Sequence, residues 1–295
     1  MTTSLERTES LRGHAAMLLF AALISVSFTL GDLAAPHIEP SALTAARFLL
    51  AACIIGALAF PKMAATHFRA PWRYPLVGGL LAGYFILMFE ALKITDPVST
   101  GAVFTLTPIM SAVFGWILMR QITTPMMAVS LVLAGIGAIW VIFRADIDAI
   151  LGLKLGPGER IFVIGCASHA LYAPMSRLLN RGEPIFVYTF GGICGGLLVT
   201  MVWGWREVAA TDWLSLPGIA WAAVIYLAVF ATATTFFLIQ YATLRLPSAK
   251  VMAYGYLVPS FVILWEGLLG HGWVAAPVWL GVAATIGALL ILLRD

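Results

Sequence analysis

Residues 95–108, TDPVSTGAVFTLTP, and residues 246–259, LPSAKVMAYGYLVP, each place a proline and several small or polar residues inside an otherwise apolar run. The two stretches align at a shift of 151 residues, which pairs Pro108 with Pro259. A proline in the middle of an apolar helix removes a backbone donor and bends the helix. The chain therefore carries the same interruption twice, once in each half.

Two other matches extend the similarity between the halves. EPSALTAARF beginning at Glu39 matches EPIFVYTFGG beginning at Glu183, and GIGAIWVIFR ending at Arg144 matches TIGALLILLR ending at Arg294. Matches in the same order indicate a duplicated unit. We expect a first repeat at residues 1–144, a linker at 145–158 and a second repeat at 159–295.

The composition is that of an integral membrane protein. Of 295 residues, 61% are hydrophobic and 11% charged, and the mean hydropathy is +0.97, whereas soluble domains carry about 25% charged residues. An apolar stretch of about 20 residues crosses a bilayer as a helix. The sequence predicts an all-α protein with ten such spans, at residues 13–31, 40–60, 74–93, 97–119, 123–143, 159–179, 184–204, 216–241, 248–269 and 273–293.

The positive charges predict the orientation, because cytoplasmic loops of membrane proteins are rich in Lys and Arg. With a cytoplasmic N-terminus, eleven Lys and Arg residues lie inside and five outside. The inner set is Arg7, Arg12, Lys62, Arg69, Arg73, Arg120, Arg177, Arg181, Arg245, Lys250 and Arg294, and the outer set is Lys93, Arg144, Lys154, Arg160 and Arg206. We expect both termini in the cytoplasm of a bacterial cell. Five spans per half then make the second repeat inverted relative to the first.

A known family shares this pattern. The ten spans resemble the drug/metabolite transporter superfamily, EamA type, through LTAARFLLAA, ALKITDPVSTGAVFTLTPIMSAVFGW, ALYAPMSRLL and ATLRLPSAKVMAYGYLVPSFVIL. The resemblance implies a basket of two five-helix halves around a central cavity that opens alternately to either side of the membrane. Members move amino acids, nucleobases, vitamins, sugars or drugs.

The chain also departs from that family. Many relatives carry WG in the first span, where this chain has Ile24 and Ser25, and GE after the fourth and ninth spans. The corresponding pairs here are Arg120 with Gln121 and Gly270 with His271, and the Trp position of the sixth span holds His169. Small relatives couple to protons through a Glu in their first helix, but HAAMLLFAALISVSFTL contains no carboxylate. We expect that particular antiport mechanism to be absent.

Four ionisable residues lie well within predicted spans, namely Arg47, Glu90, His169 and Glu266. A charge at a helix centre costs roughly 2.5 to 3.5 kcal/mol, so each needs a partner or a function. Arg47, Glu90 and Glu266 fall toward the outer leaflet and are predicted to form one polar cluster for a charged substrate or a proton. The alternative is an Arg–Glu pair that pins spans 2 and 3. His169 is a candidate substrate or proton contact, or a neutral His bonded to a neighbouring helix.

Aromatic residues and prolines complete the candidates. Tyr84, Tyr254 and Tyr256 are predicted to hold the substrate, with lipid-facing aromatic side chains as the alternative. Pro108 and Pro259 are predicted to kink spans 4 and 9, either as gates or as static bends. The unequal pairs in the repeat, Val103 with Tyr254 and Thr105 with Tyr256, are expected to govern substrate choice.

These residues predict a secondary transporter of a small organic metabolite in the inner membrane, most simply an exporter of amino acids or related metabolites. Uptake of a vitamin such as riboflavin is the alternative within this class. A membrane enzyme and a non-transporting scaffold are the alternatives from other functional classes. The sequence contains no convincing catalytic motif, and a scaffold would not explain a duplicated half. We expect no enzyme activity, cofactor, metal or nucleic-acid partner, and we leave proton coupling and a homodimer open.

Overall fold

The computed structural model describes residues 4–120, 124–151, 155–243, 245–246, 251 and 253–294, which form helices joined by loops. Three positions named above, Gln121, Lys154 and Lys250, lie outside this part of the chain. The first half contains α1 (Ser4–Ala34), α2 (Pro40–Ala59), η1 (Phe60–Lys62), η2 (Ala65–Phe68), α3 (Arg73–Leu92), α4 (Pro97–Phe104), α5 (Thr107–Met119), α6 (Pro125–Ile142) and α7 (Ile147–Leu151). The second half contains α8 (Pro157–Leu179), α9 (Ile185–Ala210), α10 (Gly218–Ala228), η3 (Val229–Thr234), α11 (Thr235–Thr243), η4 (Tyr254–Leu257), α13 (Val258–Leu268) and α14 (Val278–Arg294).

The all-helical class and the ten spans predicted from the sequence are confirmed. Within the described residues, seven helical stretches are long and apolar enough to cross a bilayer. The other crossings are α8, which carries more polar side chains, and the shorter η4–α13 and α14. The chain is a multi-pass membrane protein.

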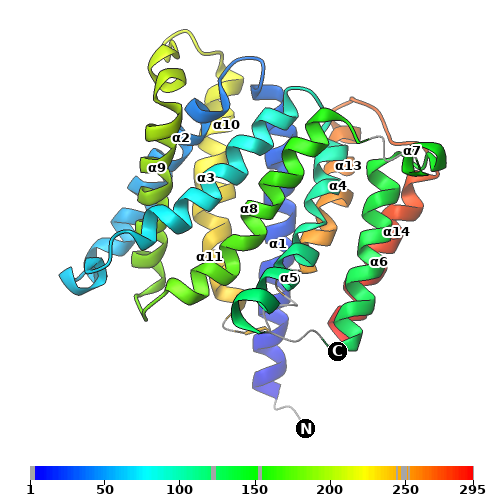
Figure 1. Cartoon of the computed structure of the whole chain (residues 1–295), viewed down its shortest axis with the longest axis horizontal. Helices are drawn as coiled ribbons and strands as arrows, with labels where there is room; N and C mark the ends of the chain where they lie inside the picture. The colour runs from blue at the N-terminus through cyan, green and yellow to red at the C-terminus, as the bar shows by residue number, and fades with distance from the viewer. Residues whose placement is uncertain are drawn as a thin grey trace.

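The helices run alternately up and down, so the loops fall on two faces of the bundle (Figure 1). The first turn of α1 and the last turn of α14 lie at one end, which we call the terminal face. The loops after α2 and α8 lie there too, as do the last turns of α5 and α11. The opposite end, the distal face, carries the loops after α1, α3, α6, α9 and α13.

The helix packing follows the two-fold symmetry of an inverted repeat. The contact of α3 with α8 has its counterpart in α11 with α1, and α5 with α8 corresponds to α13 with α1. Three contacts join equivalent helices to each other: α2 with α9, α4 with α13, and α6 with α14. Each half therefore completes its packing only against the other half.

Both repeated prolines follow a break in a membrane span. Span 4 is divided into α4 and α5 by Thr105 and Leu106, and Pro108 lies in the first turn of α5. In span 9, the 3₁₀ turn η4 lies between the helical residues 251 and 253 and helix α13, and Pro259 lies in the first turn of α13. Proline suits the first turn of a helix because the backbone N–H groups there have no intrahelical partner. The predicted kinks are thus present as helix breaks.

The broken spans cross where side chains are small. A Cβ atom added to Gly101 of α4 would lie 3.2 Å from Val262 Cγ2 and 3.7 Å from Pro259 Cα. Elsewhere, a Cβ on Gly78 of α3 would lie 2.1 Å from the carbonyl oxygen of Gly192 in α9. Small residues let membrane helices approach closely.

A buried ion pair fixes the terminal end of α3. Arg73 Nη2 donates to Glu183 Oε1 at 2.6 Å, and the two side chains are only 2% and 3% exposed. Arg73 also donates to the carbonyl groups of Ala70 and Leu179. Burial opposes ionisation of Glu183, but the hydrogen bond from Arg73 and the backbone N–H of Arg181 outweigh it and lower the pKa of Glu183 below its ordinary value.

We predict that Glu183→Gln lowers the free energy of unfolding by about 3–5 kcal/mol, because it leaves a buried guanidinium without its counter-charge. The matched control is Glu39→Gln, the equivalent position in the first repeat. Its carboxylate pairs with Lys93 at 2.6 Å but is 54% exposed, so a loss under about 1 kcal/mol is expected. Unfolding in detergent measures both changes.

The contribution of Glu183 to the free energy of unfolding should decrease as the pH falls. Because the folded-state pKa of Glu183 is lowered, its contribution is complete above its unfolded pKa of about 4.3 and is lost as pH falls through the folded value. The wild type should therefore lose more stability than Glu183→Gln on acidification below that pH. Equal losses in the two proteins would contradict this role.

Candidate functional site

One large cavity lies between the halves. Its volume is about 780 Å³, and it reaches the terminal face between α5, α6 and α8, where Met119, Thr124, Arg177 and Asn180 line it. Its closed end lies near the middle of the bundle, at Tyr84, Phe85 and Ala231. A cavity of this size accommodates a small organic molecule.

Equivalent positions of the two repeats face each other across this cavity. Tyr84 and Phe85 of α3 line it, and so do Thr235 and Phe236, their counterparts on α11. Tyr172 of α8 packs edge-on against Phe236, with ring centroids 6.2 Å apart. Aromatic walls of this kind bind planar or apolar parts of a ligand.

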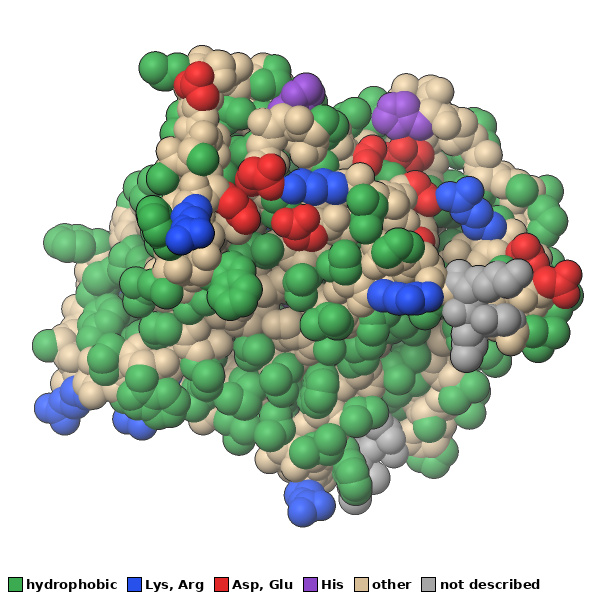
Figure 2. Space-filling view, turned by 45° about the horizontal axis from the view of Figure 1, so that its top comes forward, with side chains coloured by type: hydrophobic (Ala, Val, Ile, Leu, Met, Phe, Trp, Pro, Cys, Tyr) green, Lys and Arg blue, Asp and Glu red, His purple; other side chains and the backbone are tan. Residues whose placement is uncertain are grey.

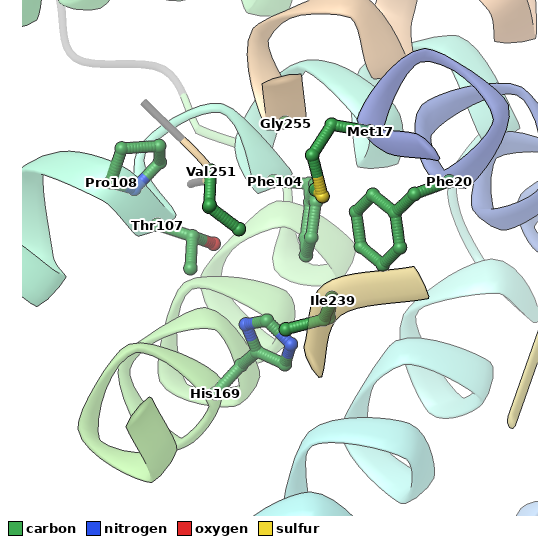
Figure 3. A pocket seen from close by; sticks show the side chains of 9 residues that line it. All are labelled: Met17, Phe20, Phe104, Thr107, Pro108, His169, Ile239, Val251 and Gly255. Atoms are coloured by element: carbon green, nitrogen blue, oxygen red, sulfur yellow. The ribbon is translucent and has the colours of Figure 1, made fainter. Parts of the chain in front are cut away.

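His169 lies where the cavity meets a small recess of about 20 Å³, room for a single water-sized molecule. Figure 3 shows its ring beside Ile239, with Thr107 and Pro108 on one side and Phe104, Phe20 and Met17 on the other. The centroid of the imidazole is 4.6 Å from that of Tyr84. Its Nδ1 is buried and has no hydrogen-bond partner among the described residues.

Two tyrosine hydroxyls in the cavity wall also lack partners. Tyr84 is 1% exposed and Tyr256 is fully buried, and neither hydroxyl makes a hydrogen bond within the described part of the chain. A buried polar group without a partner costs about 1–3 kcal/mol, so each such group requires an explanation. A polar ligand group in the cavity would satisfy them.

An aromatic cluster closes the cavity toward the distal face. The ring of Phe28 packs edge-on against Phe104 and Phe162, with centroid distances of 5.9 and 6.0 Å. Tyr84 contacts the same two rings at 5.9 and 5.8 Å. The cavity is therefore accessible from the terminal face and closed from the distal face.

Polar contacts above this cluster hold the helices together at the distal face. Thr29 of α1 and His271 bind the two oxygens of Glu266 at 2.7 Å each. Glu159 of α8 accepts from both Thr95 and Ser99 at 2.7 Å. Figure 2 shows acidic, basic and His side chains gathered on this face, above a band of hydrophobic side chains.

The predicted cluster of Arg47, Glu90 and Glu266 is not formed, because each residue has separate partners. Arg47 binds Thr232 and Ala231, and Glu90 lies 3.6 Å from Lys93 one turn along its own helix. Glu90 is 38% exposed and lies outside the cavity wall, so its predicted substrate contact is wrong for this conformation. The three residues were predicted to lie at a similar depth in the membrane, but their side chains do not lie on helix surfaces that face one another.

Of the other predicted site residues, most line the cavity, but not all of them do. His169, Tyr84, Tyr256 and Pro108 line the cavity. Tyr254 does not: its hydroxyl lies 2.9 Å from His14 Nδ1 of α1, so it joins α1 to η4 rather than facing the cavity.

Sequence reasoning missed several residues that the cavity brings together. Phe20, Tyr172 and Arg177 line it, and the periodicity of α8 could have placed Tyr172 and Ser176 on the face of His169. Asp32 was also missed. It lies half-buried near the distal end of α1, and the charges of Glu266 and His271 act on it.

Comparison with known proteins agrees with this architecture. The chain belongs to the EamA-like transporter family, which matches residues 11–143 and 156–294, and thereby to the drug/metabolite transporter superfamily. It is 24% identical over 284 residues to "Uncharacterized transporter YyaM" of Bacillus subtilis (strain 168), covering 94% of this chain and 90% of that protein. A solved structure titled "Crystal structure of protein" has the same fold, with a TM-score of 0.70, 21% identity and coverage of 97% and 96%. The chain is a membrane transporter.

We predict that Tyr84→Phe and Tyr256→Phe weaken binding of a transported solute by about fivefold or more without lowering stability, since the lost hydroxyls have no protein partner. The control is Tyr226→Phe, whose hydroxyl donates to the Leu23 carbonyl oxygen at 2.9 Å and whose loss should cost about 1 kcal/mol. Thermal unfolding with and without solute measures both effects. Destabilisation by Tyr84→Phe with unchanged affinity would show that the hydroxyl is structural.

Proposed function

We propose that this protein is a secondary transporter that moves a small organic metabolite across a bacterial inner membrane by alternating access. The observation that supports it is a cavity of about 780 Å³ that is lined by both repeats and whose described lining residues reach the terminal face and not the distal face. Cavities at the interface of inverted repeats are the usual substrate sites of such transporters. Rocking of one repeat against the other would close this mouth and open the distal face.

The termini are proposed to be cytoplasmic. The terminal face carries Lys62, Arg69, Arg120 and Arg181 in its loops, as expected for a cytoplasmic surface. The conformation described here would then accept solute from the cytoplasm, which favours export of amino acids or related metabolites. Vitamin uptake stays the alternative, and a homodimer stays a prediction.

For energy coupling, we propose that a proton binds at Glu266 and not at Glu90. The side chain of Glu266 is 10% exposed, and both of its oxygens contact groups that pin α13 at the distal face, Thr29 and His271. Protonation would weaken these contacts where the closed side must open. Glu90 is exposed and pairs with Lys93 instead.

Flux into proteoliposomes tests the function. Purified protein should accumulate a solute from a panel of radiolabelled amino acids and vitamins under an imposed pH gradient, and Glu266→Gln should abolish accumulation while solute exchange continues. Glu90→Gln is the control and should behave as wild type. No flux of any solute would contradict the transport proposal, whereas gradient-driven flux in Glu266→Gln would contradict only the coupling role.

A further inference from the structure

Arg47 brings a positive charge into the middle of the bundle. Its side chain is fully buried in α2. Nε and Nη2 donate to Thr232 Oγ1 at 3.1 and 2.7 Å, and Nη2 also donates to the Ala231 carbonyl oxygen at 3.1 Å. Nη1 has no partner in the part of the chain that the structure describes. Among the described residues, no carboxylate forms an ion pair with it. Its hydrogen bonds are therefore all to neutral groups.

The partner segment is itself unusual. Thr232 and Ala231 belong to η3, a π-helical turn at the centre of span 8. Such turns are rare and often occur at functional sites. The Thr232 hydroxyl also donates to the Leu227 carbonyl oxygen at 2.8 Å, five residues earlier. The turn thus presents a hydroxyl and a carbonyl oxygen to the guanidinium.

The guanidinium lies directly behind the closed end of the cavity. Its central carbon is 3.6 Å from the centroid of the Phe85 ring. Phe85 and Ala231, the two residues that it contacts there, both line the cavity. One layer of side chains separates the charge from a bound solute.

As far as the structure describes its wall, the cavity has positive charge and hydrogen-bond donors but no negative charge. Its lining in the described part of the chain includes Arg177 near the mouth and contains no Asp or Glu. The buried hydroxyls of Tyr84 and Tyr256 have no acceptor among the residues that the structure describes. Charges are strongly felt across such a low-dielectric interior. A solute that carries a negative charge would supply both the missing counter-charge and the missing acceptors.

We propose that the cavity selects organic solutes that carry a carboxylate, and that Arg47 is the residue that makes the selection. This inference rests on the transport function proposed above. The carboxylate is held toward the closed end, near Phe85 and the Tyr84 hydroxyl, and the apolar body of the solute packs against Phe20, Tyr172 and Phe236. Arg47 acts through its charge from behind the wall, without reaching the solute.

The test compares probes that share a ring and a chain length: 3-phenylpropionate, its primary amide and 3-phenylpropylamine, with the indole series as a larger ring. Binding to the full chain in lipid nanodiscs is measured by calorimetry. The readout is the affinity ratio of carboxylate to amide, because a defect in folding lowers both affinities but does not invert their ratio. The wild type should prefer the carboxylate by about tenfold or more.

The variants separate charge from structure. Arg47→Gln should reduce the preference to near unity, whereas Arg47→Lys should retain most of it. Thr232→Val removes the hydroxyl that binds the guanidinium but keeps the charge, so it should lower stability and leave the preference intact. If Arg47→Gln does not fold, Arg47→Met, a neutral side chain of similar length, takes its place, and it too should reduce the preference to near unity.

Equal binding of carboxylate and amide by the wild type, preference for the amine, or an undiminished preference in Arg47→Gln would each overturn the proposal. Absence of carboxylate binding by a protein that transports a neutral or cationic solute would overturn it and leave the transport function standing. Absence of flux for every solute would overturn the transport function as well.

Discussion

The lipid bilayer provides no partners for backbone polar groups, and this constraint decides where the interrupted spans must lie. A helix that breaks inside a membrane must be enclosed by other helices and must keep its N–H and C=O groups bonded. At the first break, Thr105 and Leu106 donate to the carbonyl groups of Ala102 and Val103 at 3.0 Å each. At the second break, the residues of η4 themselves form a 3₁₀ turn. The segments around both breaks are accordingly buried, from Ser99 to Phe104 with Thr107 and Pro108, and from Tyr254 to Tyr256 with Val258 and Pro259, and the two spans cross at Gly101.

This arrangement gives a symmetric scaffold with an asymmetric cavity. The pairs α2–α9, α4–α13 and α6–α14 relate equivalent helices, yet among the described residues the cavity lining reaches the terminal face and not the distal one. The two symmetry-related glutamates also differ, since Glu183 is buried with Arg73 at the terminal face while Glu39 pairs at the surface with Lys93. The exposed pair is the weaker one, and it lies on the face that must open if access alternates.

The fold could be predicted from the sequence because the features that determine it are local and occur in both repeats. Apolar length predicted the spans, and the paired prolines marked both breaks. Only part of the candidate site could be predicted from the sequence. His169, Tyr84 and Tyr256, chosen for their aromatic or titratable character, line the cavity, and their contact with a substrate stays a prediction. Depth in the membrane does not determine which helix face a residue occupies, so Glu90 was placed wrongly, and the partner of Arg47 on η3 could not be identified because a π turn has no clear sequence signature.

The central claim is that the terminal mouth closes as the distal face opens. Spin labels at Met119 and Asn180 span the mouth, and labels at Ile94 and Trp273 lie exposed on distal loops. Pulsed electron resonance on proteins that carry one labelled pair each, with Cys53, Cys166 and Cys194 replaced by Ser, measures both distances with and without transported solute. The account predicts that solute populates a shorter terminal distance and a longer distal one together. Distances that stay single and unchanged while the labelled proteins transport would contradict it.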